Sequence, residues 1–205
     1  MGKLFNYDNP VWRVVGMVAD FFLLTVLWAI CSLPIITIGA STTALFYVAL
    51  KMADNKESYI VKTYFKAFKD NFVQSTILWV IMAVIGYVLA YGIYVCYQLD
   101  LQMATVYFWI FFVLACLYIM MLMVLFALAA RLATGIGNMF MMTFMVCLKN
   151  FSWVFFMAVM LVCILALGIF VFWPILALAV GGIAFLQAKV YRHIIFPKYN
   201  WNLEE

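Results

Sequence analysis

The stretch Leu27-Trp-Ala-Ile-Cys-Ser-Leu-Pro-Ile-Ile-Thr-Ile-Gly-Ala-Ser-Thr-Thr-Ala-Leu-Phe-Tyr47 decides the fold, because it interrupts a long apolar run and then restarts it. Pro34 has no amide hydrogen to donate within a helix, and its ring restrains Leu33 before it. One helix must therefore end near Pro34, and we interpret the stretch as the tip of a helical hairpin.

Polar and small residues after the proline indicate where the chain becomes helical again. Gly39 can adopt backbone angles that other residues avoid, and Ser41 or Thr42 can cap a new helix. We therefore predict that residues 35–40 are non-helical and that a second helix starts near Ser41.

The composition is that of a membrane protein. Of the 205 residues, 70% are hydrophobic and 10% are charged, against about 45–50% and about 25% in soluble domains. Several apolar runs exceed the roughly 20 residues that cross a bilayer, and strand-like alternation is absent. The predicted fold class is all-α, a polytopic helical membrane protein, with residues 1–205 forming a single integral membrane domain.

The apolar runs predict about six transmembrane segments, paired as hairpins over residues 14–53, 73–131 and 151–193. The second segment, residues 40–53, is short, because its 14 residues reach only about 21 Å at 1.5 Å per residue. Two interpretations stay open, a full crossing and a re-entrant piece.

The distribution of basic residues favours the full crossing. If the second helix returns to the starting side, all 12 basic residues fall on one face and only Asp100 is charged on the other. Basic residues concentrate in cytoplasmic loops. We therefore expect both termini to be cytoplasmic. The 12 residues are Lys3, Arg13, Lys51, Lys56, Lys62, Lys66, Lys69, Arg131, Lys149, Lys189, Arg192 and Lys198.

Residues 57–72 have the pattern of an amphipathic helix lying at the cytoplasmic surface of the membrane. The lysines Lys62, Lys66 and Lys69 fall on one side of it. They can bind anionic lipid head groups or dock a cytoplasmic protein, and both alternatives remain open. The apolar residues that recur at helical spacing are Val61, Tyr64, Phe65, Phe68 and Phe72.

Two short echoes suggest weak internal symmetry, as in some transporters. Asn71-Phe72 and Asn150-Phe151 each precede an apolar run, and Pro34 and Pro174 each break one. These matches in apolar sequence are short, so they favour a repeat only weakly.

Residues for catalysis are scarce. The five cysteines are scattered, the single histidine, His193, lies in a basic stretch, and the sequence has no metalloprotease, nucleophile-elbow or Walker motif. We expect a non-enzymatic protein without catalytic residues, cofactor, metal or nucleic-acid partner.

Two polar features are candidate functional sites. Asp20 is an acid within the first apolar span, and an intramembrane carboxylate is a functional candidate. Arg13 lies seven residues earlier on nearly the same face, so a structural ion pair explains Asp20 as well. A helix that begins at Ser41 and Thr42 would aim free amides at an anion or a hydroxylated solute, although a capped turn also explains these residues.

Cys31-Ser-Leu-Pro-Ile-Ile-Thr-Ile-Gly-Ala-Ser-Thr-Thr-Ala44, followed by an aromatic pair and Lys51, resembles the signature of the YesL-like family. This resemblance extends from Asn9-Pro10 to the basic C-terminus, with one departure at Thr25, where an amide side chain is common. The family consists of small bacterial integral membrane proteins of unknown function, encoded beside genes for carbohydrate uptake, often by ABC importers.

The resemblance implies a multi-pass protein of the bacterial cytoplasmic membrane that acts as an accessory or regulatory subunit of a carbohydrate ABC uptake system. Its partners would be the lipid bilayer and importer subunits. The alternative function is a small transporter or channel, assembled as a homo-oligomer because the chain has few intramembrane charges.

Overall fold

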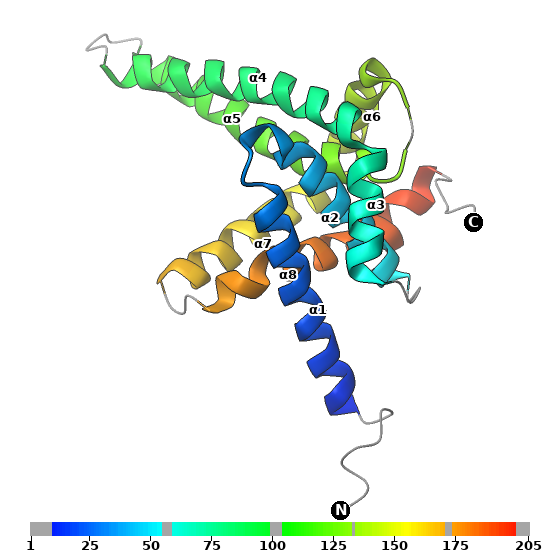
Figure 1. The fold of residues 1–205 in the computed structure, drawn as a ribbon. Helices are drawn as coiled ribbons and strands as arrows, with labels where there is room; N and C mark the ends of the chain where they lie inside the picture. Colours follow the sequence, from blue (N-terminus) through cyan, green and yellow to red (C-terminus); the bar gives the residue numbers. More distant parts are fainter. Residues whose placement is uncertain (1–9, 55–58, 99–103, 133, 171–173, 200–205) are drawn as a thin grey trace, which may run out of the picture.

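The computed structural model describes residues 10–54, 59–98, 104–132, 134–170 and 174–199, and these ranges contain helices and no strand (Figure 1). The α-helices are α1 (Pro10–Cys31), α2 (Ile38–Ala53), α3 (Ile60–Asp70), α4 (Phe72–Gln98), α5 (Ala104–Ala129), α6 (Ile136–Lys149), α7 (Phe151–Phe170) and α8 (Pro174–Val190). Short 3-10 or π turns cover Ile35–Thr37, Tyr191–Ile195 and Phe196–Tyr199. The predicted all-α class is confirmed for the described residues.

Helix α2 lies at the centre of the fold. It packs against α1, α3, α4, α5 and α8, and the two long pairs α4–α5 and α7–α8 diverge from it in different directions (Figure 1). Many side chains of α2 are buried, and three of them, Ala44, Val48 and Ala49, are fully buried. Among the candidate membrane spans of the described residues, this second segment is the most buried, and with its 3-10 turn it extends over Ile35–Ala53, which is longer than predicted.

The break at Pro34 is shorter than predicted. Helix α1 ends at Cys31, as expected before a proline, but residues 35–40 are largely helical, because a 3-10 turn occupies Ile35–Thr37 and α2 begins at Ile38. Thr37 Oγ1 lies 2.6 Å from the Cys31 carbonyl oxygen and 2.7 Å from that of Pro34. The Thr37 amide also donates to the Pro34 carbonyl, at 2.9 Å. The hydroxyl thus reaches a carbonyl at the C-terminal end of α1, where carbonyl groups lack partners within the helix, and the chain becomes helical again at once.

Gly39 is needed for packing, and the prediction that it adopts turn backbone angles is wrong. It lies inside α2, where a Cβ atom would come 2.4 Å from the Ser75 carbonyl oxygen and 2.6 Å from Trp79 Cβ. The neighbouring Thr43 accepts a hydrogen bond from Ser75 at 2.9 Å, while it donates to the Gly39 carbonyl. A small residue and a hydroxyl pair therefore hold α2 against α4, as is common between membrane helices.

Four helices among the described residues are long and apolar enough to cross a membrane: Ile35–Ala53, Phe72–Gln98, Val106–Ala129 and Phe151–Ile169. Shorter apolar helices cover Val15–Cys31 and Ile136–Lys149. The chain therefore has the helices of a membrane protein. Helix α1 is inclined steeply to α4 and α5 in Figure 1, and its residues 15–19 are exposed.

The two Asn-Phe echoes have the same local structure. Asn71 follows α3 and Asn150 follows α6, and in each case the next residue begins a long helix. Both asparagine amides donate to the carbonyl four residues earlier, Asn71 to Ala67 at 3.0 Å and Asn150 to Val146 at 3.4 Å. The asparagine thus caps the C-terminal end of a short helix at both junctions.

We predict that Gly39→Ala lowers the stability of the protein by about 1–3 kcal/mol, because the new methyl group meets backbone and Cβ atoms that cannot move independently. The measurement is thermal unfolding in detergent. Gly137→Ala is the matched control, since no atom lies within 4 Å of its added Cβ and alanine favours helices. Equal stability of the two variants would contradict the close packing of α2 on α4.

Candidate functional site

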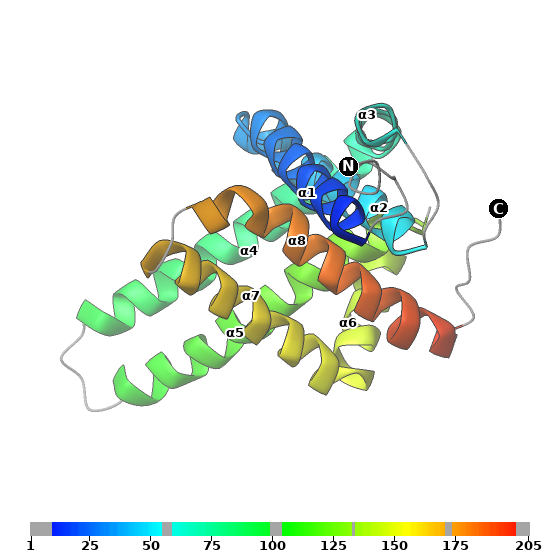
Figure 2. The ribbon, with the colours of Figure 1, turned by 90° about the horizontal axis from the view of Figure 1, so that it is seen from below.

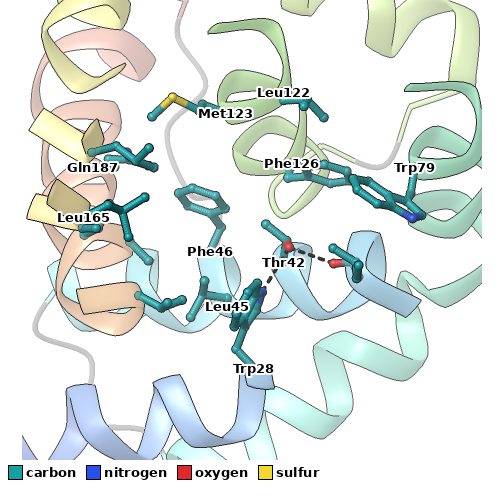
Figure 3. Close-up of a pocket in the computed structure, with 15 residues that line it drawn as sticks. Trp28, Thr42, Leu45, Phe46, Trp79, Leu122, Met123, Phe126, Leu165 and Gln187 are labelled. Carbon is teal, nitrogen blue, oxygen red and sulfur yellow. Dashed lines mark hydrogen bonds between the residues drawn. The ribbon is translucent and has the colours of Figure 1, made fainter. Parts of the chain in front are cut away.

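A cavity of about 330 Å³ lies where α2 meets the helices of the two diverging pairs. Figure 3 shows Gln187 and Leu165 on the α7–α8 side, Phe126 and Trp79 on the α4–α5 side, and Phe46 between them. All five residues line the cavity. It is therefore a partly open cavity whose walls come from elements that lie far apart in the sequence.

Helices α2 and α8 each contribute one face to the cavity. From α8 come Val180, Ile183, Ala184 and Gln187, which follow the spacing of three and four residues that places side chains on one side of a helix. The lining of α2, beginning at Ile38, has the same periodicity. The walls are therefore continuous helical stripes, mostly of aliphatic and aromatic side chains.

The hydroxyl group of Thr42, which lines the cavity, already has hydrogen-bond partners. Trp28 Nε1 donates to Thr42 Oγ1 at 3.2 Å, and Thr42 Oγ1 donates to the Ile38 carbonyl at 2.7 Å (Figure 3). Thr42 therefore lines the cavity and joins α1 to α2, and it does not cap α2 as predicted, because the helix has already begun at Ile38.

Gln187 is the unusual residue of the lining. The residue is 1% exposed, and its amide nitrogen Nε2 has no hydrogen-bond partner. Among the lining residues, all of which the structure describes, no other has a buried polar side-chain atom without a partner. A buried, unpaired donor costs about 1–3 kcal/mol.

Ser41 joins three helices. Its hydroxyl donates to the Trp28 carbonyl of α1 at 3.0 Å and accepts from the Tyr64 hydroxyl of α3 at 2.7 Å. Burial raises the pKa of Tyr64, which is consistent with a neutral hydroxyl in this bond. Ser41 is fully buried and does not cap α2, so the predicted amide site for an anion or solute is not formed there.

Thr25 connects α1 to α8. Its hydroxyl donates to the Phe21 carbonyl at 2.8 Å and accepts from the Gly181 amide at 3.0 Å. A Cβ atom on Gly181 would come 2.4 Å from the Phe21 carbonyl oxygen. The small hydroxyl at position 25 therefore suits a close crossing between two helices, where a larger amide side chain would need more space.

Asp20 is partly buried on α1, directly before Phe21, whose backbone contacts Gly181 of α8. Its predicted ion pair with Arg13 stays a prediction, because the side chain of Arg13 lies outside those that the structure describes. Pro34 is exposed at the break between α1 and α2 and does not line the cavity. The predicted site residues are thus spread over separate contacts.

A charged cluster lies where α2, α5 and α8 end. The side chain of Asp54, only 5% exposed, forms a salt bridge with Arg192 Nε. Partial burial lowers the pKa of Arg131, as does nearby Arg192, whereas Asp54 raises it. The guanidinium of Arg131 also lies 4.7 Å from the ring centre of Phe196. One buried carboxylate is therefore shared electrostatically by two arginines.

Helix α3 places the three predicted lysines, Lys62, Lys66 and Lys69, on its exposed surface. Tyr64 and Ala67 are buried against the bundle. The apolar stripe predicted from the sequence is only partly buried, since Val61 and Phe65 are 44% and 41% exposed. Helix α3 therefore presents cations and apolar side chains together.

The described residues contain no group of three or more His, Cys, Asp or Glu side chains that could hold a metal ion. They form contacts between helices and line a largely apolar cavity. Such an arrangement can bind an apolar molecule or a partner protein.

Sequence reasoning missed Gln187, Trp28 and the Asp54–Arg192 pair. The signal for Gln187 was present, since it lies on one helical face with Val180, Ile183 and Ala184. A polar residue that ends an apolar stripe is a candidate for burial. No comparable signal relates Asp54 to Arg192, which are brought together only by the packing of α2 against α8.

We predict that Arg192→Gln lowers the free energy of unfolding by about 3 kcal/mol, because it leaves the buried Asp54 carboxylate with less compensation. Denaturant titration in detergent measures this. Adding Asp54→Asn should restore at least half of the loss, whereas the exposed control Lys62→Gln should change little. If the double variant is less stable than Arg192→Gln, the pair does not act through charge.

Comparison with known proteins gives one match. No curated protein and no solved structure is significantly similar to this chain. Residues 21–93, from the middle of α1 into α4, match the family described as "Protein of unknown function, DUF624". This match, which includes the Pro34 break and the central helix α2, is consistent with the YesL-like resemblance of the sequence.

Proposed function

We propose that the protein is a non-enzymatic, multi-pass protein of the bacterial cytoplasmic membrane that acts as an accessory or regulatory subunit of a carbohydrate ABC uptake system. In this proposal α1, α2, α4, α5, α7 and α8 cross the membrane as three hairpins, and α3 lies at the cytoplasmic surface. The resemblance to the YesL-like family suggests the link to carbohydrate uptake.

The arrangement of helix ends supports this topology. In Figure 2 the ends where α4 adjoins α5 and α7 adjoins α8 point toward the left, as does the C-terminal end of α1. Helices α3 and α6 and the last turns of α8 lie toward the right. Arg131, Lys149, Lys189 and Arg192 follow or end the helices on the right. One end of the bundle is therefore basic, as cytoplasmic ends are.

We predict that reporter proteins fused at residue 1 and at residue 205 both report a cytoplasmic location. An even number of crossings returns the chain to its starting side. A fusion after Gln98 should report the opposite side, since α4 ends there. Termini on opposite faces would require an odd number of crossings and would overturn the three-hairpin proposal.

The exposed cationic surface of α3 is the observation that carries the proposed role. Its lysines project from a helix that is anchored by the buried Tyr64, which bonds to Ser41 of the central helix. Three cations near an anionic leaflet contribute roughly 1 kcal/mol each, so lipid contact alone could hold them. The exposed Val61 and Phe65 beside them add the apolar area that a protein partner needs.

The cavity favours an accessory role over sugar transport. Its lining is mainly apolar, and the Trp28–Thr42 pair is already hydrogen-bonded. Sugar hydroxyl groups need hydrogen-bond partners when they leave water. Sugar flux into liposomes that contain this protein alone would instead support the transporter alternative.

We predict that replacing Lys62, Lys66 and Lys69 together by glutamine abolishes co-purification of importer subunits from native membranes and reduces sugar uptake, while the protein still inserts. The lysines are exposed, so the fold should be preserved. The control is glutamine at Lys149, which ends α6 and lies on another surface. If partner recovery and uptake are unchanged, α3 has only a lipid-binding role.

A further inference from the structure

The unpaired amide of Gln187 requires an explanation, because native structures rarely bury a polar group without a partner. Gln187 lies at the C-terminal end of the α8 stripe that begins at Val180. Its Nε2 atom is a donor, so the missing partner is a hydrogen-bond acceptor. No protein group within the described residues supplies one.

Water is a poor candidate for that acceptor. A buried water needs two to four polar partners, and apolar cavities stay dry and bind apolar molecules. Here the Thr42 hydroxyl already bonds to Trp28 and to the Ile38 carbonyl. Among the lining residues this leaves the Gln187 amide as the buried polar group without a hydrogen-bond partner. The cavity thus has a largely apolar wall that includes the Gln187 side chain, whose amide nitrogen is a buried donor without a partner.

We propose that this cavity binds the hydrocarbon chain of a single-chain amphipathic lipid of the fatty-acid class, whose head-group oxygen accepts a hydrogen bond from Gln187 Nε2. The volume of about 330 Å³ falls at the lower end of the range of about 300–1,000 Å³ for small-molecule sites. The aromatic rings of Phe46, Trp79 and Phe126 provide apolar contact area for the chain.

The geometry orients the lipid. From Val180 to Gln187 the α8 stripe extends about 10 Å along the helix axis. Its Gln187 end lies two residues from Lys189, at the basic end of the bundle. The head group lies at this end and the chain extends toward Trp28 and Ile38. The cavity is partly open, and this opening gives the chain a route from the surrounding bilayer.

Photolabelling tests the proposal with two probes, hexadecanoic acid and hexadecane, each carrying a diazirine in the chain. The purified full chain in detergent is irradiated with each probe and digested, and the labelled peptides are identified by mass spectrometry. We expect the acid to label the cavity-lining segments of α2, α5 and α8. Labelling confined to other, lipid-facing surfaces would overturn the proposal.

Three variants separate the contribution of the cavity from that of the Gln187 amide. Ala184→Trp fills the cavity and should reduce acid labelling at least tenfold, whereas Ala90→Trp, at an exposed position of α4, should leave it unchanged. Gln187→Leu keeps a similar volume and should weaken labelling by the acid about tenfold while leaving hexadecane labelling unchanged. Equal effects on both probes, or none on the acid, would show that Gln187 does not recognise the head group. This arm remains decisive if Ala184→Trp does not fold.

Discussion

The close packing of α2 against α4 and α8 is the constraint on which the rest of the structure depends. Gly39 allows the α4 backbone to approach at Ser75, and small residues such as Ala44 and Ala49 are fully buried on α2. Lipid tails are as apolar as leucine, so close van der Waals contact, and not burial from water, holds such helices together. Loss of that contact would separate the two helical pairs that diverge from α2.

Hydroxyl groups fix the positions of the helices around α2. Thr25 accepts from the Gly181 amide, Ser41 links α1 to α3, and Thr43 pairs with Ser75. Each such bond contributes modestly, about 0.6 kcal/mol on average between membrane helices. Together they select one geometry, because a shift by one helical turn would leave several hydroxyls unpaired in an apolar environment.

This packing separates the two regions to which we assign proposed roles. The basic end carries α3, whose lysines are exposed, and the Asp54–Arg192 pair, which ties the end of α2 to the turn after α8. The interior contains an apolar cavity with the Gln187 amide. A partner at the basic end and a lipid in the interior would both contact helices that pack on α2, so either could influence the other through it.

The sequence by itself determined the membrane class, the all-helical fold, the break at Pro34 and the approximate extents of the long helices, because composition and apolar run length act locally. It also placed Lys62, Lys66 and Lys69 on one face. Only the tertiary structure decided that Gly39 is a packing residue, that Ser41 and Thr42 join helices, and that Gln187 lines a cavity. These roles depend on residues far away in the chain, and a helical pattern shows which face is apolar but not which helix covers it.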